Sequence, residues 1–146
     1  MTDLAQHTLL ATKGTVLVVD DDAMTRRLAK EMLAKLGYES EAAVDGEEAL
    51  DALCRCDYAA VLMDCYMPKL NGFDATATLR QREGQTRHTP VIAMTVSGST
   101  ETAHRCGAVG VDGFLIKPVG MGDLEELLDY WTHRSFNSRI AAAGSD

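Results

Sequence analysis

The 146-residue sequence has no long apolar run and little positive charge. No apolar segment approaches the roughly 18 residues that a membrane-spanning helix needs. The first fifteen residues lack a basic segment followed by an apolar block, so they do not resemble a signal peptide. Fourteen lysines and arginines face 22 aspartates and glutamates, for a net charge of −8, which argues against direct nucleic-acid binding. We therefore expect a cytoplasmic protein, without membrane contact, that binds cations or basic protein surfaces.

Cysteine is scarce too, and the four that are present are not spaced as a metal site. Cys54 and Cys56 are too close together for an ordinary disulfide, and no histidine follows at zinc-ligand spacing. Cys65 adjoins Asp64, but no cationic neighbour in the sequence would lower the pKa of its thiol. We expect Cys65 and Cys106, like the others, to be reduced thiols that are partly packed in the core.

The sequence does contain five short blocks that are typical of strands. Four are apolar and nearly continuous, as in strands buried on both faces. The block at 38–43 carries Glu39 and Glu41 and indicates an edge strand. The five predicted strands are 15–19, 38–43, 58–63, 90–94 and 113–117.

Amphipathic segments alternate with these blocks and predict five helices. The segments are 24–36, 46–55, 72–83, 99–108 and 124–131. The first has an apolar stripe made of Met24, Leu28, Met32, Leu33 and Leu36, and the last has a second stripe that Asp123 is placed to cap. Alternating strands and helices predict an α/β domain with a parallel sheet covered by helices. We expect one domain at 14–133, with an N-terminal tail at 1–13 and a mobile C-terminal tail at 134–146.

Polar residues stand where the predicted strands end. Asp20, Asp21 and Asp22 follow the first strand, and Asp64, Thr95 and Lys117 end the third, fourth and fifth. Ligands of open α/β sheets bind outside the carboxyl ends of the strands, so we expect these groups to meet at one edge. Crowded carboxylates suit Mg²⁺, while a hydroxyl and an ammonium suit phosphoryl oxygens. The pattern predicts Mg²⁺-assisted phosphoryl transfer with a carboxylate as the nucleophile.

Four motifs carry a resemblance to the receiver domain of two-component response regulators. They are "VLVVDDDAMTRRL" (16–28), "VLMDCYMPKLNGFD" (61–74), "VIAMT" (91–95) and "FLIKPV" (114–119). The separations between the key residues agree with the family as well: 44 positions from Asp20 to Asp64, 31 on to Thr95 and 22 on to Lys117. The resemblance covers about residues 14–132.

This resemblance implies the fold and the metal site. The fold is a doubly wound, flavodoxin-like (βα)5 domain whose parallel sheet has the order 2-1-3-4-5, with a cis bond between Lys117 and Pro118. Asp64 resembles the aspartate that accepts a phosphoryl group from a histidine kinase or a histidine phosphotransfer protein. Asp21 resembles the direct Mg²⁺ ligand, beside Asp64 and the backbone carbonyl of Tyr66. Asp20 resembles the acidic residue that reaches the metal through water.

The resemblance also implies a switch. Lys117 is similar to the lysine that contacts a phosphoryl oxygen, and Thr95 to the hydroxyl that moves toward the phosphoryl group. Phe114 stands at the aromatic switch position and would fill the space that Thr95 leaves. The implied output is a changed protein-binding face on the fourth helix, the fifth strand and the fifth helix.

Three residues depart from the usual family pattern or modify it. Val96 is bulkier than the usual small residue after Thr95, so we expect slower exchange with bulky phosphodonors. Phe114 has no hydroxyl where tyrosine is common, so its inward position gains packing but no hydrogen bond. Tyr66 could shield the acyl phosphate from water, which predicts slow autodephosphorylation.

Other functions also fit parts of the sequence. A haloacid-dehalogenase-like phosphatase would use Asp20 as nucleophile and Asp22 as acid/base, but Met24 is atypical there and Asp64 would have no role. A receiver-like scaffold that is never phosphorylated is the third possibility, against which the complete residue set argues. The sequence also fits either a stand-alone receiver or the receiver of a hybrid histidine kinase, and its motifs resemble the hybrid type.

Overall fold

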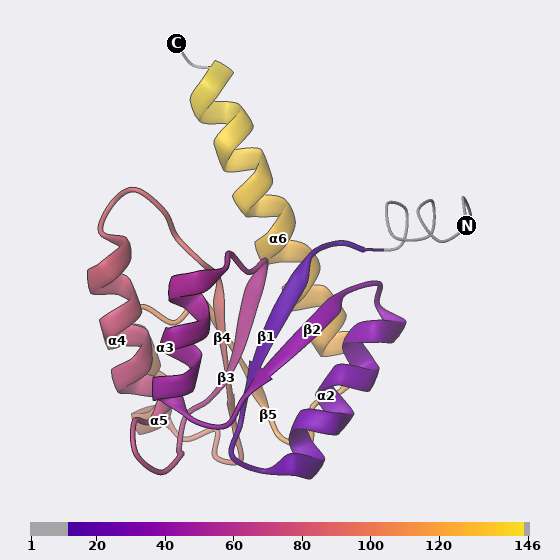
Figure 1. The fold of residues 1–146 in the computed structure, drawn as a ribbon, viewed down its shortest axis with the longest axis vertical. Helices are drawn as coiled ribbons and strands as arrows, with labels where there is room; N and C mark the ends of the chain where they lie inside the picture. The colour runs from indigo at the N-terminus through magenta and orange to yellow at the C-terminus, as the bar shows by residue number, and fades with distance from the viewer. Residues whose placement is uncertain (1–11, 145–146) are drawn as a thin grey trace.

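The computed structural model describes residues 12–144, with side chains described as far as Thr132. Within these residues five parallel strands form one sheet of order β2-β1-β3-β4-β5, as predicted (Figure 1). The strands are β1 (Thr15–Val19), β2 (Glu39–Ala43), β3 (Ala60–Asp64), β4 (Val91–Thr95) and β5 (Gly113–Ile116). Each lies within two residues of its predicted bounds.

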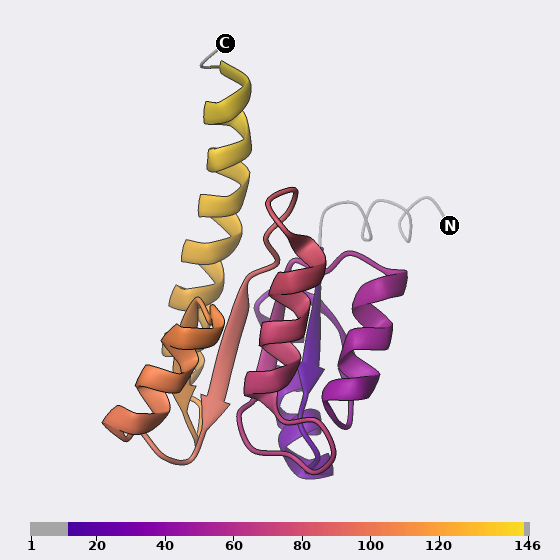
Figure 2. The same cartoon turned by 90° about the vertical axis from the view of Figure 1, so that its left-hand side faces the viewer.

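Helices cover both faces of the sheet. They are α2 (Ala23–Lys35), α3 (Gly46–Arg55), α4 (Gly72–Glu83), α5 (Thr100–Val109) and α6 (Met121–Gly144). Figures 1 and 2 show α3, α4 and α5 on one face and α2 and α6 on the other. One buried apolar cluster joins the sheet to α3 and α4, and a second joins it to α2 and α6. The core therefore has two layers of side chains, as expected for a parallel sheet buried on both faces.

Side-chain caps fix where four of the helices begin. Asp22, Asp45, Asn71 and Ser99 each precede a helix and accept a hydrogen bond from the backbone N–H three residues further on. Such caps satisfy one of the amides that the first turn leaves free. The bounds of α3 and α4 match the predicted ones.

Burial differs between the central and the edge strands. All residues of β3 and β4 are buried, and four of the five in β1. In β5 only Leu115 is buried, while Ile116 is 53% exposed. The prediction of burial on both faces is thus wrong for β5, because this strand lies at the edge of the sheet and pairs only with β4. The predicted edge position of β2 is confirmed.

The apolar stripe of α2 is only partly buried. Leu33 is fully buried, but Met24 is 64% and Leu28 is 52% exposed. Both exposed side chains belong to the first half of the helix, next to the carboxyl edge of the sheet. Leu28 lines an open cavity there. The periodicity therefore identified the helix but not the extent of its contact with the core.

The last helix starts earlier and runs further than predicted. It begins at Met121, so Asp123 lies in its first turn and is not its cap. The backbone stays helical to Gly144, through most of the segment expected as a mobile tail. The predicted N-terminal tail lies, apart from Thr12 and Lys13, outside the described residues. The exact division into domain and tails stays a prediction. No helix within residues 12–144 is both long and apolar enough to cross a bilayer.

A buried charge network closes the end of the sheet opposite to the acidic residues. Arg80 on α4 donates to the backbone carbonyls of Gly110 at 3.0 Å and Thr89 at 2.8 Å. It also pairs with Glu83 at 2.7 Å and Asp112 at 2.9 Å. One guanidinium thus joins α4 to the segments that precede β4 and β5. This network holds the sheet and one helix layer together at that end of the domain.

Candidate functional site

The polar residues that end the strands do meet at the carboxyl edge of the sheet. Asp64 is the last residue of β3 and pairs with Met94, the residue before Thr95. Thr95 pairs with Ile116, and the backbone N–H of Lys117 donates to the Thr95 carbonyl at 2.8 Å. Parallel strands in this register bring their carboxyl ends together, which is why residues far apart in sequence become neighbours.

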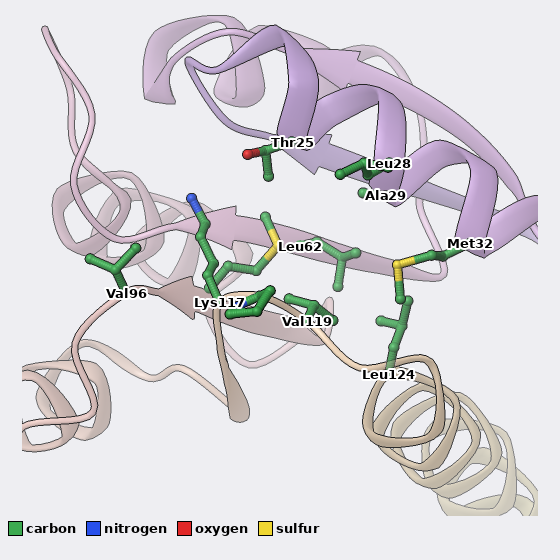
Figure 3. A pocket seen from close by; sticks show the side chains of 11 residues that line it. Thr25, Leu28, Ala29, Met32, Leu62, Val96, Lys117, Val119 and Leu124 are labelled. Carbon is green, nitrogen blue, oxygen red and sulfur yellow. The ribbon is translucent and has the colours of Figure 1, made fainter.

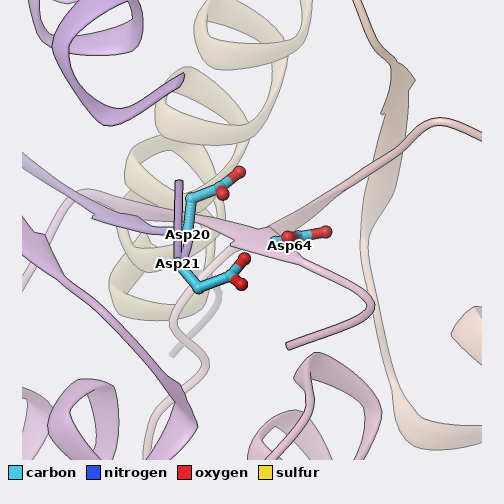
Figure 4. Close-up of side chains that lie close together, drawn as sticks. All are labelled: Asp20, Asp21 and Asp64. Carbon is cyan, nitrogen blue, oxygen red and sulfur yellow. The ribbon is translucent and has the colours of Figure 1, made fainter. Parts of the chain in front are cut away.

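Three carboxylates form the centre of the site. Asp20, Asp21 and Asp64 each offer an oxygen, and these oxygens lie within 4.8 Å of one another (Figure 4). Asp20 is fully buried and Asp64 is nearly so, whereas Asp21 is exposed. Like charges this close repel one another unless a cation is present. The all-oxygen donor set, open to solvent on one side, fits a hard divalent cation such as Mg²⁺.

Asp20 is held in place from three sides. Its carboxylate accepts from the Asp22 N–H at 2.9 Å and from the Lys117 ammonium at 2.7 Å, while its backbone carbonyl accepts from Arg26 at 2.8 Å. The same ammonium lies 3.5 Å from an Asp64 oxygen. Burial alone would lower the pKa of Lys117, but the two aspartates outweigh burial and raise it. Lys117 is therefore a charged group fixed between two carboxylates.

The Asp64 carboxyl has a perturbed pKa. Burial is the largest cause and the nearby Asp20 charge adds to it, so the pKa of Asp64 is raised to about 6. Lys117 and the Tyr66 N–H, which donates to Asp64 at 3.3 Å, act in the opposite direction. Above pH 6 the group is a carboxylate that is poorly solvated, a state that favours bond formation with an electrophile or a cation.

A glycine lets the following loop pass close to Asp64. The N–H of Gly72 donates to the Cys65 carbonyl at 3.1 Å. A Cβ at Gly72 would lie 2.2 Å from the backbone carbonyl oxygen of Asp64. Only glycine allows this approach, so the start of α4 is packed directly against the end of β3.

Tyr66 adopts an arrangement that its predicted roles did not include. Its side chain is 49% exposed, and its hydroxyl forms a hydrogen bond of 3.1 Å with the hydroxyl of Thr102 on α5. Its ring packs edge-on against Phe73, with ring centres 5.4 Å apart. The metal-binding role of its backbone carbonyl and the shielding of the acyl phosphate stay predictions.

The two predicted switch residues, Thr95 and Phe114, lie on the neighbouring strands β4 and β5. Thr95 is buried, and its hydroxyl accepts from the Ser97 N–H at 3.1 Å. Phe114 pairs with Ala93 on the neighbouring strand and is partly buried. It packs on a small apolar cluster made of Cys65, Phe73, Ala93 and Cys106. Their roles in a switch stay predictions, and the implied cis bond between Lys117 and Pro118 is confirmed.

Among the described residues all four cysteines are free, as predicted. Cys65 and Cys106 are buried with their sulfurs 4.0 Å apart. Cys54 and Cys56 are exposed at the C-terminal end of α3, so the predicted packing in the core is wrong for these two. Burial, and then the neighbouring thiol, raises the pKa of Cys65 to about 12. A thiol with so high a pKa is hardly ionised near neutral pH, which supports the prediction of an unreactive core residue.

Sequence reasoning missed Thr102 and the side-chain bonds of the α5 start. Ser99 carries a helix-start signal in the sequence, but Thr102 carries none that points to the site. Its proximity to Tyr66 arises only because α5 packs beside the loop that follows β3. No local pattern reports such a contact.

Comparisons with known proteins agree with this geometry. The response regulator receiver domain model matches residues 16–129. The sensor histidine kinase RcsC of Escherichia coli (strain K12) is 37% identical over 124 residues, which cover 85% of this chain and 13% of that protein. The hybrid signal transduction protein dokA of Dictyostelium discoideum is 34% identical over 119 residues, which cover 82% of this chain and 7% of that protein.

Solved structures show the same likeness. The receiver domain of the sensor histidine kinase PA1611 from Pseudomonas aeruginosa has a magnesium ion coordinated in its active site cleft. It is 32% identical with a TM-score of 0.76, covering 82% of this chain and 98% of that one. The chemotaxis protein CheY4 of Vibrio cholerae is 33% identical with a TM-score of 0.74, covering 80% of this chain and 96% of that one. The chain therefore belongs to the response regulator receiver domain family of two-component signalling.

Proposed function

We propose that this receiver domain accepts a phosphoryl group from a phosphohistidine onto Asp64 and thereby changes a protein-binding surface. The observation that carries the proposal is the position of the Asp64 carboxylate. It lies 3.5 Å from the Lys117 ammonium and shares one acidic cluster with Asp20 and Asp21. An acceptor, a fixed cation and a metal-binding donor set in one place are the parts that phosphoryl transfer needs.

We propose Asp21, Asp64 and the backbone carbonyl of Tyr66 as direct ligands of Mg²⁺, with Asp20 reaching the ion through water. The hard oxygen donors support this choice over a softer metal. When bound, the ion neutralises negative charge on the phosphoryl oxygens. The magnesium in the PA1611 receiver, a relative at 32% identity, supports the same assignment here.

In the proposed reaction an Asp64 carboxylate oxygen bonds to phosphorus as the phosphorus–nitrogen bond of the phosphohistidine breaks. Lys117 lies beside the acceptor and offsets charge on a phosphoryl oxygen. The Thr95 hydroxyl oxygen already accepts from the Ser97 N–H, so its own proton can be donated to a phosphoryl oxygen. Movement of Thr95 toward that oxygen, with Phe114 filling the space, is the proposed switch.

We propose that the phosphodonor docks over α2 and the loop after β5. An open cavity of about 480 Å³ lies between these segments, with mostly apolar walls that reach the core (Figure 3). Lys117 and the 77%-exposed Val96 also line it, so the cavity borders the acceptor site. The exposed Met24 lies on the same helix as Leu28, which lines the cavity. An apolar helix face beside a phosphohistidine would fit this surface.

The partner would be a histidine kinase or a histidine phosphotransfer protein. The yeast receiver domain of Ssk1, which shares this fold at 24% identity with a TM-score of 0.76, has been solved together with the histidine phosphotransfer protein Ypd1. We propose a cytoplasmic site of action. The chain spans 13% of RcsC and 7% of dokA, so membership of a hybrid kinase and a stand-alone receiver both remain as proposals.

We propose the face formed by α5, β5 and α6 as the surface that a downstream protein reads. Ile116 is 53% and Tyr130 is 48% exposed on it, so apolar area is available for a partner. Both residues line a hollow on this face, together with the acidic residues Asp112, Asp123 and Glu126. A partner segment with apolar and basic residues would complement it.

Phosphorylation by a small donor tests the proposal. The full chain is incubated with acetyl phosphate and Mg²⁺, and uptake is measured by intact mass. We expect one phosphoryl group on the wild type, none on Asp64→Asn, and normal uptake by Asp22→Asn. Loss of the covalent label in Asp20→Asn together with its retention in Asp64→Asn would instead indicate the phosphatase chemistry. A wild type that takes up no phosphoryl group from acetyl phosphate or from a phosphorylated histidine phosphotransfer protein would support the scaffold alternative.

Slow autodephosphorylation is a further part of the proposal. Val96 and Tyr66 flank the acceptor edge and would limit the approach of water. After removal of the donor, the label on the wild type should decay slowly, and Val96→Ala should speed its decay. A half-life of seconds for the wild type would contradict the proposed shielding.

A further inference from the structure

A continuous series of hydrogen bonds joins Asp64 to Thr95 through the start of α5. Its first part begins at the acceptor, where the Tyr66 N–H donates to Asp64 Oδ1 at 3.3 Å. The hydroxyl of the same tyrosine reaches the Thr102 hydroxyl at 3.1 Å. One residue therefore contacts both the acceptor carboxylate and the first turn of α5.

The second part leads from α5 back to the predicted switch hydroxyl. The Ser99 hydroxyl donates to Thr102 Oγ1 at 3.0 Å and accepts from the Thr102 N–H at 3.2 Å, which caps the helix. The Ser99 N–H donates to Ser97 Oγ at 3.4 Å, and the Ser97 N–H donates to Thr95 Oγ1 at 3.1 Å. Thr102 is the point where the two parts meet.

Thr102 is buried, so water cannot easily replace a hydrogen bond that its hydroxyl loses. Thr102 is 2% exposed and its hydroxyl has two hydroxyl partners, so the loss of one leaves a buried polar group short of a bond. Tyr66 is half exposed, and without this bond its long side chain has fewer contacts that fix one rotamer. A second contact adds to the same link: Tyr66 packs on Phe73, whose ring lies 3.9 Å from the Arg105 guanidinium of α5.

We propose that Thr102 is a positioning residue that holds α5 and Tyr66 in the arrangement of the unmodified domain. The proposal rests on the proposed phosphorylation of Asp64. When the Thr95 hydroxyl moves toward a phosphoryl oxygen, its bond to the Ser97 N–H must break or pull the 96–99 loop along. That loop ends in the cap of α5, so the shift strains the bond between Thr102 and Tyr66. The bond therefore opposes the switched arrangement.

Loss of this bond should make phosphorylation faster, because the competent arrangement becomes more populated. A typical hydrogen bond of this kind corresponds to a change of about two- to tenfold in such an equilibrium. The effect should depend on the hydroxyl groups and not on the shape of the side chains. Removing the Thr102 hydroxyl or the Tyr66 hydroxyl should have the same effect on the rate, and removing both should have no larger effect.

The test measures the rate of acetyl phosphate labelling, with Mg²⁺, on the full chain. Thr102→Val removes the hydroxyl and keeps the shape and the helix cap, whereas Thr102→Ser keeps a hydroxyl. Tyr66→Phe removes the other partner at a half-exposed position where the fold tolerates change. Thr100→Val is the matched control, because Thr100 is an exposed threonine in the same turn.

We expect Thr102→Val and Tyr66→Phe each to label about two- to tenfold faster than wild type, and the double variant no faster than either. Thr102→Ser and Thr100→Val should label at the wild-type rate. Wild-type rates in both Thr102→Val and Tyr66→Phe, or effects that multiply in the double variant, would overturn the proposal while the labelled wild type still supports phosphorylation of Asp64. A wild type without label would count against the proposed function itself.

Discussion

Neutralising the Asp64 carboxylate should stabilise the metal-free domain, and the gain should grow with pH. The carboxyl is nearly buried beside Asp20, and its pKa is raised from the ordinary 3.8 to about 6. The folded state thus holds the Asp64 proton more tightly than the unfolded chain does. The stabilisation that comes from this tighter proton binding is present below pH 4 and is lost as the pH rises through 6. At neutral pH the ionised group therefore destabilises the fold.

The size of the effect follows from the shift. A difference of about two pKa units, at about 1.4 kcal/mol each, destabilises the wild type by about 3 kcal/mol at pH 7.5. At pH 4.5, where the folded group is protonated and the unfolded one is mostly ionised, the cost is about 1 kcal/mol. Asparagine has nearly the same shape and no charge, so Asp64→Asn should recover these amounts. The gain should be about 2 kcal/mol larger at pH 7.5 than at pH 4.5.

Urea unfolding followed by far-UV circular dichroism, with EDTA present, measures this difference. Asp51→Asn is the matched control, because Asp51 is an exposed aspartate on α3 and its neutralisation changes the net charge equally. The reasoning is refuted if Asp64→Asn stabilises no more than Asp51→Asn at pH 7.5. It is also refuted if the gain is the same at both pH values.

Three further changes test other parts of the structure. Arg80→Met should lower the free energy of unfolding by about 3–5 kcal/mol, because it removes the guanidinium from buried Glu83 and leaves Asp112 with His88 as its ion-pair partner. A loss below 1 kcal/mol in urea unfolding would contradict this. Gly72→Ala should slow acetyl phosphate labelling and lower the melting temperature, because its Cβ would lie 2.2 Å from the Asp64 carbonyl oxygen. Gly107→Ala, with open space around the Cβ, is its control and should stabilise α5 by up to about 1 kcal/mol. Mg²⁺ should raise the wild-type melting temperature and EDTA should reverse this, whereas Asp21→Asn should respond much less; equal responses would count against the proposed ligand.

Much of the fold could be predicted because its signals are local. The amphipathic segments 46–55 and 72–83 predict α3 and α4, and their bounds agree with the structure. Continuous apolar blocks predict the central strands β1, β3 and β4, which are buried on both faces. The same type of block wrongly predicted burial on both faces for β5, because apolar residues also occur on an exposed edge strand that can bind partners.

Other errors share one physical cause. Asp123 has the residue type of a cap, but α6 begins two residues earlier, where the Leu124 N–H donates to the Gly120 carbonyl. The stripe on α2 predicts a buried face, but Met24 in the first turn of the helix is exposed. Helix starts and burial depend on what lies opposite an element, which local periodicity does not contain.

For the candidate site, position in the chain was enough to select the acidic cluster, Lys117 and Thr95, but it also selected Asp22, which caps α2 and is not part of the cluster. Each ends a strand, and parallel strands bring their ends to one edge. By itself the sequence thus determined the alternation of elements and most of the groups at that edge. The tertiary structure alone decided the raised pKa of Asp64, which comes from burial, and the link from Tyr66 through Thr102. Both depend on distances between segments far apart in the chain, and such distances exist only once the helices pack on the sheet.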